Sequence, residues 1–188
     1  MIGMARFPLI DIEQMSALQQ EFVSEISAGP RGGISGPFIP LVHAPELARR
    51  IQKIGEYLRF ESSLSADITE MVILLTAKHW KCDFEWHFHV QLARQLTALS
   101  PSAIDAIAVG KKPVELTAEQ SAAYLFCMDI QQSKQVSDAG FNAAKDIFGL
   151  PGALELLALC GYYSMLAMIL NAAQLMPPGG PVPELRDA

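Results

Sequence analysis

Residues 70 to 89 contain the side chains that could do chemistry. Within this segment Cys82, Glu85 and His89 follow one another at steps of three and four residues. On a helix these steps place the three side chains on one face, whereas His87 points away from them. A carboxylate beside an imidazole can act as an acid–base pair, because histidine titrates near neutral pH. The segment therefore predicts proton transfer at Glu85 and His89, although a solvated surface pair has the same spacing.

A metal site would be a second use of these residue types. Glu85, His79, His87 and His89 are all potential zinc ligands. Because His87 and His89 diverge on a helix, such a site would need ligands from elsewhere in the chain. We therefore expect no metal centre.

The three cysteines offer a third kind of chemistry. Cys82, Cys127 and Cys160 are odd in number, far apart, and fit neither a disulfide framework nor a metal-binding pattern. Cys82 lies near a helix N-terminus, which can lower the pKa of a thiol, and Cys127 or Cys160 could approach it. The simplest interpretation is three reduced thiols in a cytoplasmic protein.

The central segment resembles the carboxymuconolactone decarboxylase family of the alkylhydroperoxidase D-like superfamily. In the redox branch of that superfamily, a Glu is followed after eleven residues by Cys-x-x-Cys-x-x-x-His. Here Glu70, Cys82 and His89 stand at the Glu, first Cys and His positions, and Glu85 replaces the second Cys. The resulting Glu85-Trp86-x-x-His89 is similar to the non-redox members. Other segments that look like the family lie at residues 36–38, 43–47, 58–60, 155–156 and 161–163.

The resemblance implies a fold, an assembly and a reaction. The fold is an all-α, alkylhydroperoxidase D-like helical bundle, and the assembly is a homo-oligomer, commonly a trimer or hexamer. The reaction removes CO2 from a small carboxylated lactone and needs no organic cofactor. The catalytic residues that it implies are Glu70, Glu85 and His89.

A decarboxylase also needs groups that hold the carboxylates of its substrate. Arg59 and His43 are candidates for this clamp, and surface or loop-packing roles suit them equally. Cys82 and Trp86 complete the expected substrate-binding set, because both belong to the motif; Trp86 could equally be a core or pocket-wall residue.

Two alternatives to the decarboxylase remain open. One is a thiol-dependent alkylhydroperoxidase or peroxiredoxin-like activity, which the missing second cysteine argues against, because that chemistry needs an attacking and a resolving thiol. The other is a non-catalytic oligomeric protein that binds a small molecule in the same pocket.

Helix signals run along the whole chain. No strand-like alternation persists, and good helix formers dominate. Caps, prolines and glycines predict helices at about 11–27, 45–60, 65–80, 83–96, 100–110, from 117, at 137–149 and at 151–176. A glycine- and proline-rich loop covers 29–45. We expect one domain at 36–176, preceded by a helix and loop at 1–35 and followed by a tail at 177–188.

Composition restricts the partners of the protein. The chain has 188 residues, 51% of them hydrophobic, and a mean hydropathy of +0.23. A small domain has too little interior to bury so many apolar side chains easily. The uncharged run 156–170 is therefore expected to be a buried or subunit-interface helix rather than a membrane span. A net charge of −6 and the absence of a long basic run argue against nucleic-acid binding. The first residues do not resemble a signal peptide, so we expect a cytoplasmic protein.

Overall fold

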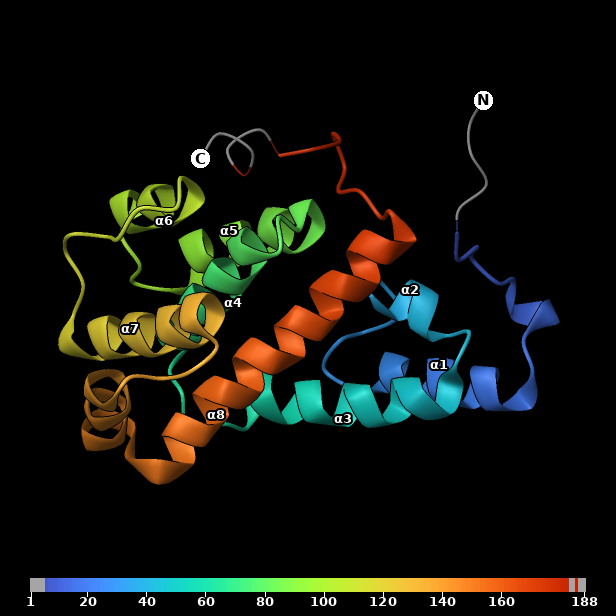
Figure 1. The fold of residues 1–188 in the computed structure, drawn as a ribbon. Helices are drawn as coiled ribbons and strands as arrows, with labels where there is room; N and C mark the ends of the chain where they lie inside the picture. The colour runs from blue at the N-terminus through green and yellow to red at the C-terminus, as the bar shows by residue number, and fades with distance from the viewer. Residues whose placement is uncertain (1–5, 183–184, 186–188) are drawn as a thin grey trace.

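The computed structural model describes residues 6–182 and residue 185 of the chain. Within these residues every regular element is a helix, as expected for an all-α protein (Figure 1). In chain order the elements are η1 (Ile12–Gln14), α1 (Ala17–Ala28), α2 (Phe38–Leu41), α3 (Pro45–Phe60), α4 (Ala66–His79), α5 (Asp83–Leu96), α6 (Pro101–Ala108), α7 (Ala118–Ser133) and α8 (Asp138–Ala173).

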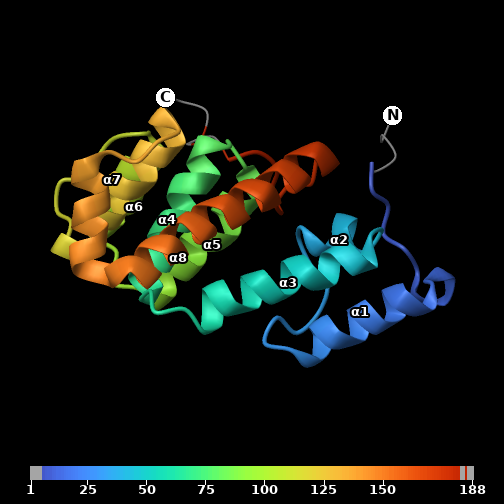
Figure 2. The same cartoon turned by 60° about the horizontal axis from the view of Figure 1, so that its bottom comes forward.

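Helix α4 is the centre of the fold, because every residue from Ile68 to Ala77 is buried. It packs against α5, α6, α7 and α8, whereas α3 packs against α1, α2 and α8. The long helix α8 crosses the molecule, with α4 to α7 on one side of it and α1 to α3 on the other (Figure 1 and Figure 2). Contacts of α8 with both groups join them into a single domain.

Local capping signals determine where most helices begin. The side-chain oxygens of Ser65, Ser100 and Ser137 each accept a hydrogen bond from the backbone N–H three residues on. Thr117 and Gln120 form the expected capping box. These bonds satisfy backbone N–H groups that the first helical turn leaves without partners.

The first helix begins later than the sequence suggested. Asp11 precedes only the short 3-10 turn η1, and its side chain makes no capping bond. The cap of α1 is Ser16, which forms a reciprocal capping box with Gln19. Two side chains satisfy two backbone donors there, so the capping box at Ser16 prevails over the single acidic residue at Asp11.

Helix α8 contains the predicted break at Gly149. This residue has a φ of 69° and a ψ of 177°, which are not helical, and Pro151 follows it. The two helical halves abut closely enough to form one kinked element. The second half ends at Ala173 rather than near Met176, because Gln174 adopts a left-handed conformation with a φ of 57°.

One face of the apolar second half of α8 lies in the protein core. Leu156, Leu159 and Leu170 are completely buried, as expected for this run. By length and composition Asp138–Ala173 could also cross a membrane, but 56% of its most apolar window is buried inside the protein. Core helices have the same properties.

Part of the C-terminal tail folds back on its own chain. Val182 and Leu185 are buried, and the backbone N–H of Val182 donates to Asp83 Oδ1 at 2.9 Å. The Nζ group of Lys78 donates to the carbonyl of Leu185. The described part of the tail therefore covers the region where α4 ends and α5 begins.

Candidate functional site

Four helices contribute to the candidate site. Arg59 lies in the last turn of α3, Glu70 in the buried part of α4, Glu85 and His89 on α5, and Tyr163 on α8. Helices α5 and α8 pack against α4, and α3 packs against α8, so the site lies against the core rather than on an exposed loop.

A tight connection sets α5 against α4. Lys81 adopts a left-handed conformation with a φ of 48°, which lets the chain reverse direction within the three residues Trp80–Cys82. The side-chain amide of Asn171 donates to the carbonyl of Trp80 at 2.9 Å and ties this turn to α8. The reversal brings residues of α5 opposite residues of α4.

His89 lies between two buried carboxylates. Its Nδ1 atom donates to Glu70 Oε2 at 2.7 Å, and its Nε2 atom lies 3.3 Å from Glu85 Oε2. All three side chains are less than 10% exposed. The close approach expected from the spacing of residues 70, 85 and 89 is therefore present, and the second nitrogen of the imidazole faces the carboxylate one helical turn away.

This environment changes the proton affinity of the imidazole. Burial by itself lowers the pKa of His89, but the hydrogen bonds and charges of Glu70 and Glu85 outweigh burial and raise it above the ordinary histidine value. The histidine is therefore stabilised as an imidazolium, a proton donor held between two acceptors.

A cavity of about 360 Å³ opens beside this triad. Glu85, His89 and Tyr163 line it, whereas Glu70 contacts His89 from behind. Tyr163 meets the His89 ring edge-on, with ring centroids 5.2 Å apart. The triad therefore presents Glu85 and His89 to any molecule in the cavity.

The glycine- and proline-rich loop before α3 closes the cavity on one side. Gly36 has a φ of 53°, and a Cβ atom there would lie 2.8 Å from the ring of Phe84. Only glycine allows this close approach, so the loop can lie directly on α5. Pro30, Gly33 and Pro37 of the same loop line the cavity.

Two arginines line the cavity, of which only one was expected. Arg59 Nη2 lies 3.9 Å from Glu70 Oε1, so this arginine shares its charge with the triad. Arg31, in the loop, lies over the ring of Phe38 and donates from Nε to Gln52 Oε1 at 3.0 Å. No signal in the sequence pointed to Arg31, because a lone arginine in an irregular loop has no periodicity to place it.

The other expected substrate-binding residues lie elsewhere. His43 Nε2 is 2.8 Å from the carbonyl of Pro8 and its ring meets Phe7, so it holds the N-terminal segment. Trp86 is buried and lines a separate pocket together with Ile104 of α6. Neither residue lines the cavity beside His89.

Cys82 is also absent from the cavity wall. Its side chain is completely buried against Ala167 and Leu170 of α8. Burial raises the pKa of Cys82 to about 12, which outweighs the backbone hydrogen bonds near the start of α5. The lowered pKa that its helix position suggested is therefore wrong.

The remaining two thiols approach each other instead of Cys82. Cys127 Sγ and Cys160 Sγ are 3.2 Å apart and buried between α7 and α8. The hydrogen bond to Cys160 and burial raise the pKa of Cys127 well above the ordinary value. Within the described residues, no group of three or more His, Cys, Asp or Glu side chains is arranged to hold a metal ion.

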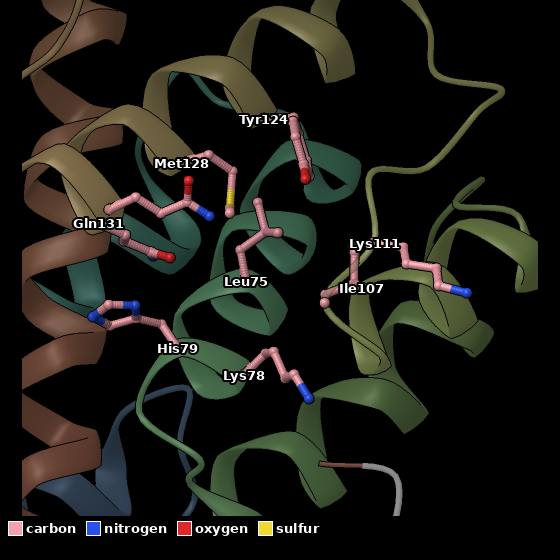
Figure 3. Close-up of a pocket in the computed structure, with 10 residues that line it drawn as sticks. Leu75, Lys78, His79, Ile107, Lys111, Tyr124, Met128 and Gln131 are labelled. Atoms are coloured by element: carbon pink, nitrogen blue, oxygen red, sulfur yellow. The ribbon is translucent and has the colours of Figure 1, made fainter. Parts of the chain in front are cut away.

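A second, smaller cavity of about 170 Å³ lies between α4, α6 and α7 (Figure 3). Leu75, Ile107 and Met128 form its apolar part, and Tyr124 and Lys111 lie at its edge. It contains none of the residues that the motif singled out.

Comparisons with known proteins identify the fold. A peroxidase-related protein from Ralstonia eutropha JMP134, uncharacterised and with an alkylhydroperoxidase AhpD core, is 19% identical, with a TM-score of 0.75 over 98% of this chain and 96% of that one. An uncharacterised peroxidase-related protein from Silicibacter sp. TM1040 is 18% identical, with a TM-score of 0.74 over 92% and 90%. A protein of unknown function from Agrobacterium tumefaciens is 16% identical, with a TM-score of 0.64 over 73% and 94%.

Comparisons of the sequence do not identify a family for this protein. No family model matches the chain, and no curated protein is significantly similar to it. At these identities the structural likeness concerns the arrangement of helices, which spans nearly the whole chain. The protein therefore has the alkylhydroperoxidase D-like fold.

Proposed function

We propose that this protein is a decarboxylase of the carboxymuconolactone type, acting on a small carboxylated lactone or a related acid. The observation that carries the proposal is the position of His89, hydrogen-bonded to Glu70 and 3.3 Å from Glu85, at the wall of a cavity that two arginines also line. Proton donor, proton acceptor and cationic groups are thus adjacent.

Each of these groups has a separate role in the reaction. When the bond to the carboxylate carbon breaks, CO2 leaves and the electron pair remains on the ring carbon, conjugated with the lactone carbonyl. Arg59 holds a carboxylate of the substrate and stabilises the developing negative charge. The Glu85–His89 pair then donates a proton to carbon and recovers it from water.

Two features prepare the pair for this step. The Oε1 atom of Glu85 is buried and has no hydrogen-bond partner among the residues that the structure describes. It is therefore available to a reacting group in the cavity. Glu70 acts through His89, because its carboxylate fixes the ring orientation and keeps the proton on the imidazole.

The test is a panel of carboxylated lactones assayed for CO2 release. We expect turnover by the wild type, a loss of about 10²- to 10⁴-fold in His89→Gln, and the wild-type rate in His87→Gln. His87 is the matched control, because it lies on the same helix, contacts Gln91, and does not line the cavity. Binding without CO2 release would favour the non-catalytic reading, and a His89→Gln rate equal to the wild type would contradict the mechanism.

The geometry gives less support to a thiol peroxidase. Two proteins of the same fold are called peroxidase-related. Here, however, Cys82 is completely buried with a pKa of about 12, and a carboxylate stands three residues after it. A peroxidatic thiol must ionise and reach its substrate. We therefore keep acid–base chemistry as the proposed function.

We also infer that the protein self-associates. Leu150 and Leu154 of α8 and Ile54 of α3 are more than half exposed, and Leu154 and Ile54 line one apolar groove. A groove of this kind on α3 and α8 suits a second copy of the chain, in agreement with the apolar composition.

A further inference from the structure

We propose that Arg31 and Tyr162 form a subsite for a second, non-reacting carboxylate of the substrate. This inference rests on the proposed function, because Arg31 lines the same cavity and the Tyr162 hydroxyl lies directly beside Arg31. It adds Arg31, to which no sequence pattern pointed, and Tyr162, which belongs to the family-like segment 161–163 but had no role assigned.

Arg31 is a cation without an anionic partner. Within the described part of the chain, Arg49, Arg50, Arg59 and Arg94 each have a carboxylate within 4.0 Å. Arg31 has none, and neither has Arg6, but Arg6 is exposed and donates to the carbonyl of Ala172. Its Nη2 atom is buried and makes no hydrogen bond to a described residue. A guanidinium that is partly withdrawn from water without a counter-charge is costly, unless a ligand supplies that charge.

The guanidinium is held in place before any ligand arrives. Gln52, itself buried, accepts from Arg31 Nε at 3.0 Å. The Cζ atom of the group lies over the Phe38 ring, 4.9 Å from its centre. Both contacts are with neutral groups, so they fix the direction of the guanidinium and leave its charge for an anion.

Tyr162 supplies a second donor at the same place. A Cβ atom on Gly55 would lie 2.0 Å from the Tyr162 hydroxyl and 2.6 Å from Arg31 Nη2, so these two atoms are close neighbours over Gly55. The hydroxyl is also buried and has no partner in residues 6–182 or 185. Burial raises its pKa to about 12, so it remains a donor at neutral pH.

Arg31 Nη2 and the Tyr162 hydroxyl are neighbouring donors, and neither has an acceptor among the described residues. A carboxylate has two oxygens and can accept from a guanidinium and a phenol together. The subsite belongs to the same polar cluster as the triad, because Tyr162 stacks edge-on against Tyr163, and Tyr163 against His89. A molecule with carboxylates at both ends could therefore contact Arg31 and Tyr162 at one end and Arg59 and His89 at the other.

Binding of adipate and hexanoate tests the subsite directly. Both acids have six carbons, and they differ in the second carboxylate. By calorimetry we expect the wild type to prefer adipate by about tenfold, the effect of one charge-assisted hydrogen bond. In Arg31→Gln and in Tyr162→Phe the preference should fall to nearly one. The matched controls should keep it: Arg50→Gln changes an exposed arginine paired with Glu46, and Tyr124→Phe changes a tyrosine that lines the smaller cavity between α4, α6 and α7.

Tyr162→Phe also separates ligand binding from folding. It deletes only a hydroxyl that has no partner in the described structure, so the free protein should unfold at the same temperature or higher. A lower unfolding temperature with an unchanged preference for adipate would mean that the hydroxyl is structural. Equal binding of the two acids by the wild type would overturn the subsite as well.

The two proposals fail in different ways. A preference for adipate that depends on Arg31 and Tyr162, without CO2 release from any lactone, would support the subsite and contradict the decarboxylase proposal. If Arg31→Gln and Tyr162→Phe turn over a dicarboxylated lactone with the wild-type KM, the decarboxylase proposal is supported and the subsite is contradicted.

Discussion

Glu70 on α4 and His89 on α5 are joined by a hydrogen bond of 2.7 Å, although they are 19 residues apart in the chain. This bond leaves the other imidazole nitrogen facing Glu85 at the cavity wall. The buried carboxylate of Glu70 therefore controls both the direction and the protonation of the proposed proton donor.

The first prediction concerns Glu70→Gln. The amide keeps the shape of the side chain but removes one of the two charges that raise the pKa of His89. We expect that pKa to fall, because one of the charges that favour the imidazolium is gone. The alkaline limb of the pH–rate profile should move to lower pH by the same amount, because the imidazolium is then lost earlier.

Imidazole NMR of His89 and the pH dependence of kcat measure this shift independently. The matched control is Glu119→Gln, an exposed glutamate in the first turn of α7. A pH profile that is the same in Glu70→Gln and the wild type would mean that Glu70 does not set the protonation of His89.

The second prediction concerns the pH dependence of stability. The folded-state pKa of His89 is raised above its unfolded value, so its protonated form stabilises the fold. This contribution is complete below the ordinary histidine pKa and disappears as pH rises through the folded-state value. The unfolding temperature of the wild type should therefore exceed that of His89→Gln most in mild acid, and the difference should shrink with rising pH.

Thermal unfolding of the two proteins from about pH 5.5 to about pH 9 tests this. A difference that stays constant or grows toward alkaline pH would contradict the raised pKa, and would assign the effect of the substitution to packing alone.

The third prediction concerns the thiols. Cys82, Cys127 and Cys160 are all buried, so a thiol reagent should modify the native protein slowly and the unfolded protein at once. Peroxide consumption with a dithiol reductant should be absent, and Cys82→Ala should release CO2 from the lactone at the wild-type rate. Peroxide turnover that disappears in Cys82→Ser would reverse our choice and favour the peroxidase.

The fourth prediction concerns assembly. Sedimentation at micromolar concentration should show a species larger than the 20.5 kDa chain. Leu154→Glu places a charge in the apolar groove on α3 and α8 and should shift this species toward the monomer. Val114→Glu is the control, because Val114 is 96% exposed in the loop before α7. A wild-type protein that sediments as a 20.5 kDa monomer would rule out self-association.

Local sequence signals determined the helices of this protein. The caps at Ser65 and Thr117, Pro45 at the start of α3 and the break at Gly149 all act through bonds or torsions within a few residues. Such interactions do not depend on the rest of the fold, so a reader of the sequence can find them. The predicted helix start at residue 11 was wrong, because the capping box at Ser16 lies five residues further on.

The helical period also determined that Glu85 and His89 share a face, since they are four residues apart. It could not determine what that face would meet. Trp86 is one residue from Glu85, which turns its side chain by about 100° toward α6 and away from the cavity. Cys82 precedes the helix and packs against α8.

Only the tertiary structure decided which distant residues complete the site. Arg31 comes from an irregular loop, where no repeat in the sequence indicates the direction of a side chain. Its place beside Tyr162 depends on Gly55, whose missing Cβ leaves room for both groups. The cavity and the cluster of charged side chains form between helices that are far apart in the chain. Their geometry is therefore set only when α3, α5 and α8 have packed together.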